Sequence, residues 1–100
     1  MDDETLEIVT FKTVPTVTPE AVLVAAQGML PWLKTVPGFL SRHMARAEDD
    51  QWVDCVRWDS KANALAAADA IMTAPGAADF MSVIEPNSVV MRHYHVALTV

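Results

Sequence analysis

The sequence has 100 residues, a formal net charge of −6 and a hydrophobic fraction of 52%. This length fits one domain spanning residues 1–100, because two half-length units would each lack a workable core. The acidic balance and the seven scattered Lys and Arg residues argue against nucleic acid as a partner.

The first predicted elements are a strand and a helix. Residues 5–13 alternate loosely in hydropathy, which indicates a strand. The run Thr18-Pro19-Glu20 is typical of a helix start, with a hydroxyl cap, a proline in the first turn and an acid near the positive end of the helix dipole. Pro31 removes a backbone donor, so it should interrupt this helix, and Pro37-Gly38 ends it.

An antiparallel hairpin follows. Residues 39–45 and 51–58 have the composition of strands, and the acidic run Glu48-Asp49-Asp50 between them predicts a solvated turn. A second helix starts at Asp59-Ser60 and breaks at Pro75-Gly76. We expect a short helix over residues 77–84 and a long last strand over residues 88–100.

The predicted order is β-α-β-β-α-β, an α+β fold of the ferredoxin-like kind with one antiparallel four-stranded sheet. Right-handed crossovers place both helices on one face of that sheet. The strands are apolar on both faces, however: Trp52, Val56 and Trp58 alternate with Val53 and Cys55. The strands of a sheet that is covered on one side only should alternate between apolar and polar residues. We therefore expect a homodimer in which a second sheet covers the open face.

The expected compartment is the cytoplasm. No apolar run approaches the length of about 18 residues that a membrane helix needs, so no membrane partner is expected. The acidic start Met1-Asp2-Asp3-Glu4 is unlike a signal or transit peptide. The single cysteine, Cys55, offers no disulfide framework and suits a reducing environment.

Two runs of the sequence resemble a known family. Val36-Pro37-Gly38-Phe39-Leu40-Ser41 closes the first helix, and Val53-Asp54-Cys55-Val56-Arg57-Trp58-Asp59-Ser60 leads into the second. Together they look like the antibiotic biosynthesis monooxygenase family, over roughly residues 5 to 85. The resemblance implies a dimeric α+β barrel. In the best-understood member type it also implies oxidation of a polycyclic aromatic phenol by molecular oxygen, without a cofactor.

The resemblance also implies a pocket, in which this chain departs from the pattern. The pocket tryptophan of that member type falls on Trp58, and its pocket asparagine falls on Asp54. Its pocket tyrosine would fall at Ala64, and its pocket arginine near Phe80 or Met81, where no side chain here can replace it. The resemblance therefore supports the fold and a pocket better than it supports that reaction.

The residues predict part of the pocket independently. Asp54 and Trp58 are four apart on a strand and so share a face. If Asp49-Asp50 is a two-residue turn, residues 39, 41 and 43 lie on that same face; a loop one residue longer would reverse the assignment. The second helix would face this wall with alanines. The predicted site comprises Asp54 and His43 as catalytic residues, and Trp58, Ser41, Phe39, Ala64 and Ala67 as substrate-binding residues.

The predicted chemistry is proton removal followed by electron transfer to oxygen. Such a reaction needs a base, donors for an enolate oxygen and a dry pocket. Burial beside Trp58 should raise the pKa of Asp54 and suit it as the base, with His43 as a base or donor. The competing interpretation is that Asp54 simply hydrogen-bonds Arg57 or Arg42, or caps a backbone group.

Other functions stay open at this stage. His93 and His95 point the same way on the last strand, but two histidines without a third ligand are a weak metal signal, so we expect no metal and no cofactor. The leading hypothesis is a cofactor-independent monooxygenase-like protein acting on a small hydrophobic aromatic or quinol-like compound. The alternatives are a non-catalytic dimeric protein that binds a small molecule, and an isomerase or lyase-type relative.

Overall fold

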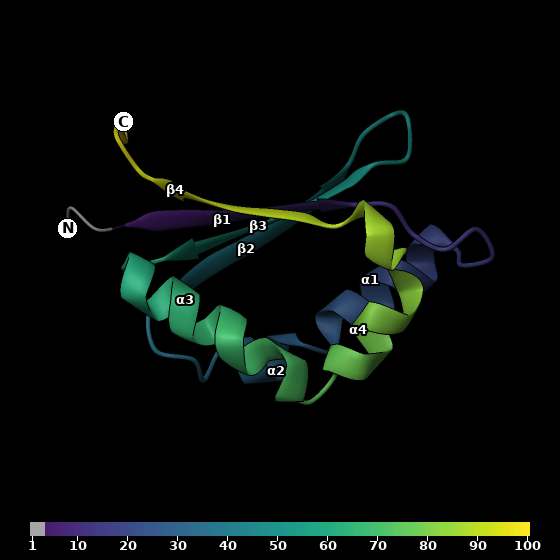
Figure 1. The fold of residues 1–100 in the computed structure, drawn as a ribbon, viewed down its shortest axis with the longest axis horizontal. Helices are drawn as coiled ribbons and strands as arrows, with labels where there is room; N and C mark the ends of the chain where they lie inside the picture. The colour runs from purple at the N-terminus through teal and green to yellow at the C-terminus, as the bar shows by residue number, and fades with distance from the viewer. Residues whose placement is uncertain (1–3) are drawn as a thin grey trace.

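The computed structural model describes residues 4–100, so the first three residues of the acidic start Met1-Asp2-Asp3-Glu4 lie outside the described residues. Figure 1 shows the strands in one layer and the helices in another. In chain order the elements are β1 (Thr5–Phe11), α1 (Pro19–Gln27), α2 (Leu30–Leu33), β2 (Phe39–Arg46), β3 (Trp52–Trp58), α3 (Lys61–Ala70), η1 (Ile71–Thr73), α4 (Ala77–Val83), η2 (Pro86–Ser88) and β4 (Val90–His95).

The strands form one antiparallel sheet in the order β2-β3-β1-β4. The helices lie together on one side of it (Figure 1), as expected for right-handed crossovers. The predicted β-α-β-β-α-β order and ferredoxin-like α+β class are confirmed. Within residues 4–100, no element covers the other face of the sheet. No helix in this part of the chain is long and apolar enough to cross a membrane.

The first helix begins and breaks for local reasons. The Thr18 hydroxyl accepts a hydrogen bond from the Ala21 N–H at 3.1 Å, as the predicted cap requires. The interruption comes earlier than Pro31 itself, because α1 ends at Gln27 and a turn at residues 28–29 follows. Pro31 then sits in the first turn of α2, where its missing N–H costs nothing.

The second helical region is held against the first by a glycine. The Ser60 hydroxyl accepts a hydrogen bond from the Asn63 N–H at 3.1 Å and starts α3. Gly76, with φ +87°, starts α4, and a Cβ there would lie 2.6 Å from the Gly28 carbonyl oxygen. Only glycine allows this conformation and this close approach, which places α4 over the end of α1.

The hairpin between β2 and β3 differs from the prediction. The Ala47 N–H donates to the Gln51 carbonyl at 2.7 Å, and Asp50 has φ +67°. The loop is therefore the three residues 48–50 with a left-handed last position, a common hairpin geometry. The assumed two-residue turn at Asp49-Asp50 was wrong. With one more residue in the loop, the side chains in the neighbouring part of β2 point to the opposite face of the sheet from the one expected.

This reversal moves two predicted site residues. Ser41 pairs with Arg57 and His43 with Cys55, so both lie on the sheet face away from the helices. Arg42 pairs with the core residue Val56 and faces the helices instead. An irregularity between Phe39 and Ser41 restores the expected face for Phe39, which pairs with Trp58.

The last strand is shorter than predicted. It ends at His95 rather than at residue 100, although the Val96 N–H still donates to the Glu4 carbonyl at 2.9 Å. Beyond this point the chain has passed the end of β1 and has no partner strand among the described residues, so its backbone cannot extend the ladder.

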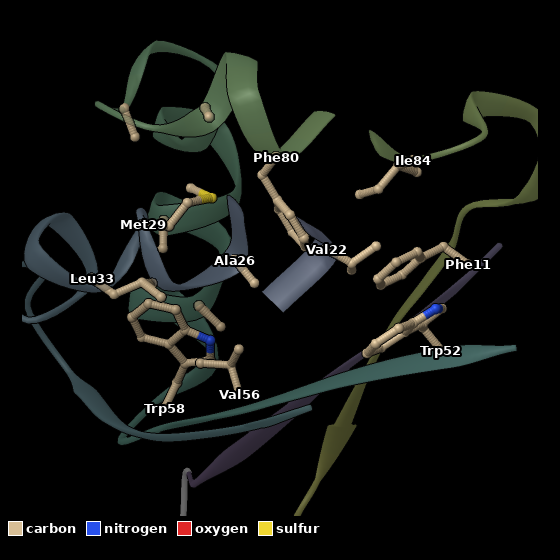
Figure 2. Close-up of a cluster of buried hydrophobic side chains, with 14 residues drawn as sticks. Phe11, Val22, Ala26, Met29, Leu33, Trp52, Val56, Trp58, Phe80 and Ile84 are labelled. Carbon is tan, nitrogen blue, oxygen red and sulfur yellow. The ribbon is translucent and has the colours of Figure 1, made fainter. Parts of the chain in front are cut away.

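The hydrophobic core fills the space between the sheet and the helices (Figure 2). At one end Phe11 stacks on Trp52 with ring centroids 6.4 Å apart, and Phe80 meets Phe11 edge-on at 5.9 Å. At the other end Trp58 is 1% exposed and lies beside Val56. The core therefore brings aromatic side chains from the sheet and from α4 to the same layer.

Candidate functional site

A cavity of about 150 Å³ lies between the helix-facing side of the sheet and the helical layer. Its wall is almost entirely apolar, and three of the described residues that line it carry charge: Glu7, Arg42 and Asp54. The remaining lining residues are Val9, Phe11, Met29, Trp32, Leu33, Val56, Trp58, Ala67, Ala68, Ile71, Met72, Ala77, Phe80, Met81, Ile84, Val89 and Met91. Four of its lining residues are exposed, Met72 at 65% most of all, and the others are Met81, Val89 and Met91. Such a space suits a small apolar ligand.

The structure brings part of the predicted site to this cavity. Trp58, Asp54 and Ala67 line it. Phe39 packs edge-on against Trp58, with ring centroids 5.9 Å apart, and does not itself line the cavity. Ala64 is fully buried in the core beside it. Ser41 and His43, on the opposite face of the sheet, are not brought to it.

Asp54 is held by Arg42. The Arg42 Nε donates to both Asp54 oxygens, at 3.0 and 3.2 Å, and Nη2 donates to Oδ2 at 2.7 Å. The pair is buried, with side-chain exposures of 8% and 10%. Of the two hydrogen-bond partners that the sequence offered for Asp54, Arg42 is therefore the one found in the structure. Arg57, the other candidate partner, bonds Glu4 at 2.9 Å.

Arg42 also brings a cation to the helical wall. Its Nη1 donates to the Ala26 carbonyl at 2.8 Å, and its guanidinium lies 5.4 Å from the centre of the Phe80 ring. The matched positions, Phe80 and Met81, carry no guanidinium, as the sequence shows, but Arg42 places one beside Phe80. The residue comes from β2 rather than from the second helical region, and the three-residue hairpin loop is what turns it inward.

Glu7 is a second buried carboxylate that the sequence reasoning missed. It lies on β1, is 6% exposed, and its Oε2 is 3.0 Å from His93 Nε2 on the neighbouring β4. Burial raises the pKa of the Glu7 carboxyl, and the hydrogen bond and charge of His93 partly offset the rise. A signal was present, because Glu7 shares its strand face with Val9 and Phe11.

Trp58 contributes a polar atom to this region. Its buried indole N–H has no hydrogen-bond partner of acceptable geometry within residues 4–100. It nevertheless lies near enough to Glu7 to lower the pKa of that carboxyl. Unpaired buried donors are costly, so this N–H is available to an acceptor on a bound molecule.

The histidines do not gather as a metal site would require. His93 is engaged by Glu7, and His43 lies on the other face of the sheet. No group of three or more His, Cys, Asp or Glu side chains suited to a metal ion occurs among the described residues.

Comparison with known proteins identifies the fold. No protein-family model matches the sequence, and no curated protein matches it. SnoaB, a cofactor-independent oxygenase from Streptomyces nogalater, superposes with a TM-score of 0.78 at 15% identity, covering 97% of this chain and 96% of SnoaB. This chain has the fold of the antibiotic biosynthesis monooxygenases.

Two further solved structures agree with this assignment. A protein from Bordetella bronchiseptica, provisionally named an antibiotic biosynthesis monooxygenase, matches with a TM-score of 0.77 at 13% identity over 96% of this chain and 99% of its own. A provisionally named monooxygenase from Shewanella loihica matches at 0.71 and 21% identity over 99% of both. At these identities the likeness to the antibiotic biosynthesis monooxygenases concerns the fold, and the chemistry rests on the residues of this chain.

Proposed function

We propose that this protein is a cofactor-independent monooxygenase acting on a small hydrophobic aromatic or quinol-like compound. The observation that carries the proposal is an apolar cavity whose wall holds a buried carboxylate, Glu7, a buried guanidinium, Arg42, and the unpartnered indole N–H of Trp58. The SnoaB-like fold supports it. Apolar cavities of about 150 Å³ accept a benzene-sized ring, so a larger ligand would displace flexible, exposed methionines of the lining, such as Met72.

The reaction requires no redox group from the protein when the substrate is electron-rich. A base in the cavity takes a proton from an activated carbon, and the C–H electron pair becomes an enolate or carbanion. One electron passes to O₂, and the substrate radical and superoxide combine to a peroxide. Uptake of a proton and loss of water then leave one oxygen atom on the carbon as a new carbonyl.

The chain supplies what these steps need from its own side chains. Trp58 offers a flat wall and an N–H donor, and Arg42 offers a cation for the developing oxyanion. The small side chain of Ala67, on α3, leaves room in the cavity for an aromatic ring. Few other polar groups line the space, which favours exclusion of water.

Oxygen uptake with dithranol, an anthrone, tests this proposal. We expect metal-free and flavin-free protein to consume oxygen faster than the spontaneous reaction. Ala67→Phe should fill the cavity and reduce the added rate to background. Ala66→Phe, a change to an exposed residue next to it on α3, is the matched control and should keep the rate. No uptake above the spontaneous rate, or equal rates in the two variants, would contradict the proposal.

A second candidate is a non-catalytic protein that binds small aromatic molecules. It is favoured by the pairing of both buried carboxylates, because Asp54 is held by Arg42 and Glu7 by His93. A binding protein would bind dithranol saturably and consume no oxygen. An isomerase-type relative would convert its substrate equally well without oxygen.

We also propose that two copies pack through the open face of the sheet. That face carries a mixed but largely apolar surface, with Val90 54% and Tyr94 43% exposed and Leu6, Ile8 and Cys55 partly exposed. A second copy of this face would cover these side chains and give the dimeric α+β barrel implied by the family resemblance. Cytoplasmic location stays a prediction from the sequence.

A further inference from the structure

We propose that Glu7 is the general base of the cavity and that His93 links it to solvent as a proton relay. The inference rests on the proposed function in taking the substrate to be an aromatic carbon acid, a compound with an acidic C–H beside a carbonyl and a ring. Glu7 lines the cavity and is 6% exposed, and its Oε2 lies 3.0 Å from His93 Nε2.

The contacts of the two buried carboxylates favour Glu7 over Asp54. Both oxygens of Asp54 accept hydrogen bonds from Arg42, so a proton on Asp54 would disrupt a buried ion pair. The contact of Glu7 with His93 uses one of its two oxygens, Oε2, and the neutral Trp58 N–H near the carboxyl brings no charge, so a proton on Glu7 breaks no ion pair with a guanidinium. Glu7 can therefore change its protonation state with less disturbance of the wall.

The proposed step is a balanced proton transfer. The substrate C–H bond breaks, its electron pair moves onto the carbonyl oxygen as an enolate, and the proton goes to the Glu7 carboxylate. Arg42, which also lines the cavity, stabilises the enolate charge. His93, whose side chain is 16% exposed, then carries the proton from Glu7 toward solvent.

The surroundings of Glu7 suit a base that works near neutral pH. The charged and titratable groups that act on it are His93 on β4 and Asp54 on β3; Arg42, on β2 of the same sheet, also lines the cavity, while α3 and α4 line it with uncharged side chains. Burial raises the pKa of Glu7, His93 and the Trp58 N–H lower it in part, and the nearby Asp54 charge adds a smaller rise. A carboxylate with a raised pKa is a stronger base.

The test is hydrogen–deuterium exchange into 2-tetralone, a two-ring carbon acid, in D₂O without oxygen. NMR follows deuterium entering the methylene between the carbonyl and the aromatic ring. Glu7→Gln keeps the shape of the side chain and should slow the catalysed exchange by about a hundredfold. Glu48→Gln, the same change on the exposed hairpin loop, is the matched control and should keep the rate. Circular dichroism confirms that each variant is folded.

The pH dependence of the exchange rate distinguishes a general base from a residue with a structural role. Wild-type exchange should rise with pH as Glu7 ionises and then level off. His93→Gln removes a partner that lowers the pKa of Glu7, so the midpoint should move to higher pH.

Three results would overturn the inference: equal exchange in Glu7→Gln and wild type, loss of exchange in Asp54→Asn without loss in Glu7→Gln, or no exchange above the protein-free rate. Because the assay excludes oxygen, catalysed exchange in a protein that shows no oxygen uptake would support Glu7 as the base and contradict the proposed monooxygenase function.

Discussion

At the residue scale, the cavity contains two buried carboxylates with different partners. Asp54 has a permanent cation, Arg42, on both of its oxygens, whereas Glu7 has an imidazole, His93, whose charge depends on pH. Three hydrogen bonds from Arg42 hold the Asp54 carboxylate, whereas a single contact with His93 holds Glu7. The Asp54 pair is therefore the more constrained part of the wall.

The raised pKa of Glu7 predicts how stability depends on pH. The folded state binds this proton more tightly than the unfolded state, in which the carboxyl has an ordinary pKa of 4.5. The stability from Glu7 is complete below that value and is lost as pH rises through the raised pKa. Glu7→Gln should therefore be more stable than wild type at neutral pH, and the difference should shrink toward pH of about 4. Urea unfolding across this range measures it; a difference that does not change with pH would contradict it.

The Arg42–Asp54 pair predicts a strongly asymmetric mutational effect. Arg42→Met leaves the Asp54 carboxylate buried and unpaired, and should lower the free energy of unfolding by about 3–5 kcal/mol. The double variant Arg42→Met/Asp54→Leu should recover most of that loss, because no charge stays buried. Urea unfolding at neutral pH is the measurement.

The ion pair of Arg57 with Glu4, whose side chains are 42% and 24% exposed in one chain, supplies the comparison for this experiment. Arg57→Met should change stability far less than Arg42→Met. Similar losses in the two single variants would show that Asp54 is solvated rather than buried.

At the scale of elements, the helix starts and the order of the elements could be predicted from the sequence. Which residues of β2 point toward the helices could not. The caps at Thr18 and Ser60 are local hydrogen bonds and formed as expected. Which β2 residues face inward depends on the loop length, which the run Glu48-Asp49-Asp50 leaves undecided between two and three residues. Because the loop has three residues rather than two, Arg42 faces the site and His43 faces away from it.

The rest of the site depended on long-range pairing. Glu7 and His93 are 86 positions apart and meet because β4 returns beside β1. The sequence predicted that these strands exist, but the register between them is set by packing of the whole sheet. A charged residue on the buried side of a strand, such as Glu7, was the local sign that a partner was needed.

The hairpin loop makes its own prediction. Asp50 has φ +67°, a conformation that β-branched residues adopt poorly. Asp50→Val should therefore destabilise the protein by about 1–2 kcal/mol, while Asp50→Gly should not. Glu48→Val, in the same loop without a positive φ, is the control and should have a small effect. Chemical denaturation measures all three; equal stability of Asp50→Val and Glu48→Val would contradict this loop geometry.

At the scale of the whole molecule, the sheet has one face under helices and one open face. The open face is too apolar to be a purely solvated surface, since it displays Val90, Tyr94 and Cys55. Its burial against a second copy would leave the cavity, on the other side of the sheet, within a single subunit. Dimer formation and the cavity chemistry are therefore separable by mutation.

The dimer predicts a mass in solution near twice the chain mass of 10.9 kDa at micromolar concentration. Val90→Lys introduces a charge on the proposed contact face, at the most exposed of its large apolar residues, and should shift the protein toward the monomer. Leu65→Lys, at a residue on α3 that is 44% exposed, is the matched control and should leave the mass unchanged. Light scattering coupled to size exclusion gives the answer, and a wild-type mass of one chain would rule the dimer out.

Labelling with ¹⁸O₂ tests most directly the claim that the cavity supports oxygenation without a cofactor. Metal-free, flavin-free protein is mixed with dithranol under ¹⁸O₂, and mass spectrometry follows the oxidised product. We predict one ¹⁸O atom per product molecule, formed faster than without protein, with the added rate lost in Ala67→Phe and kept in Ala66→Phe. Labelled product that forms no faster with the protein than without it would contradict the claim.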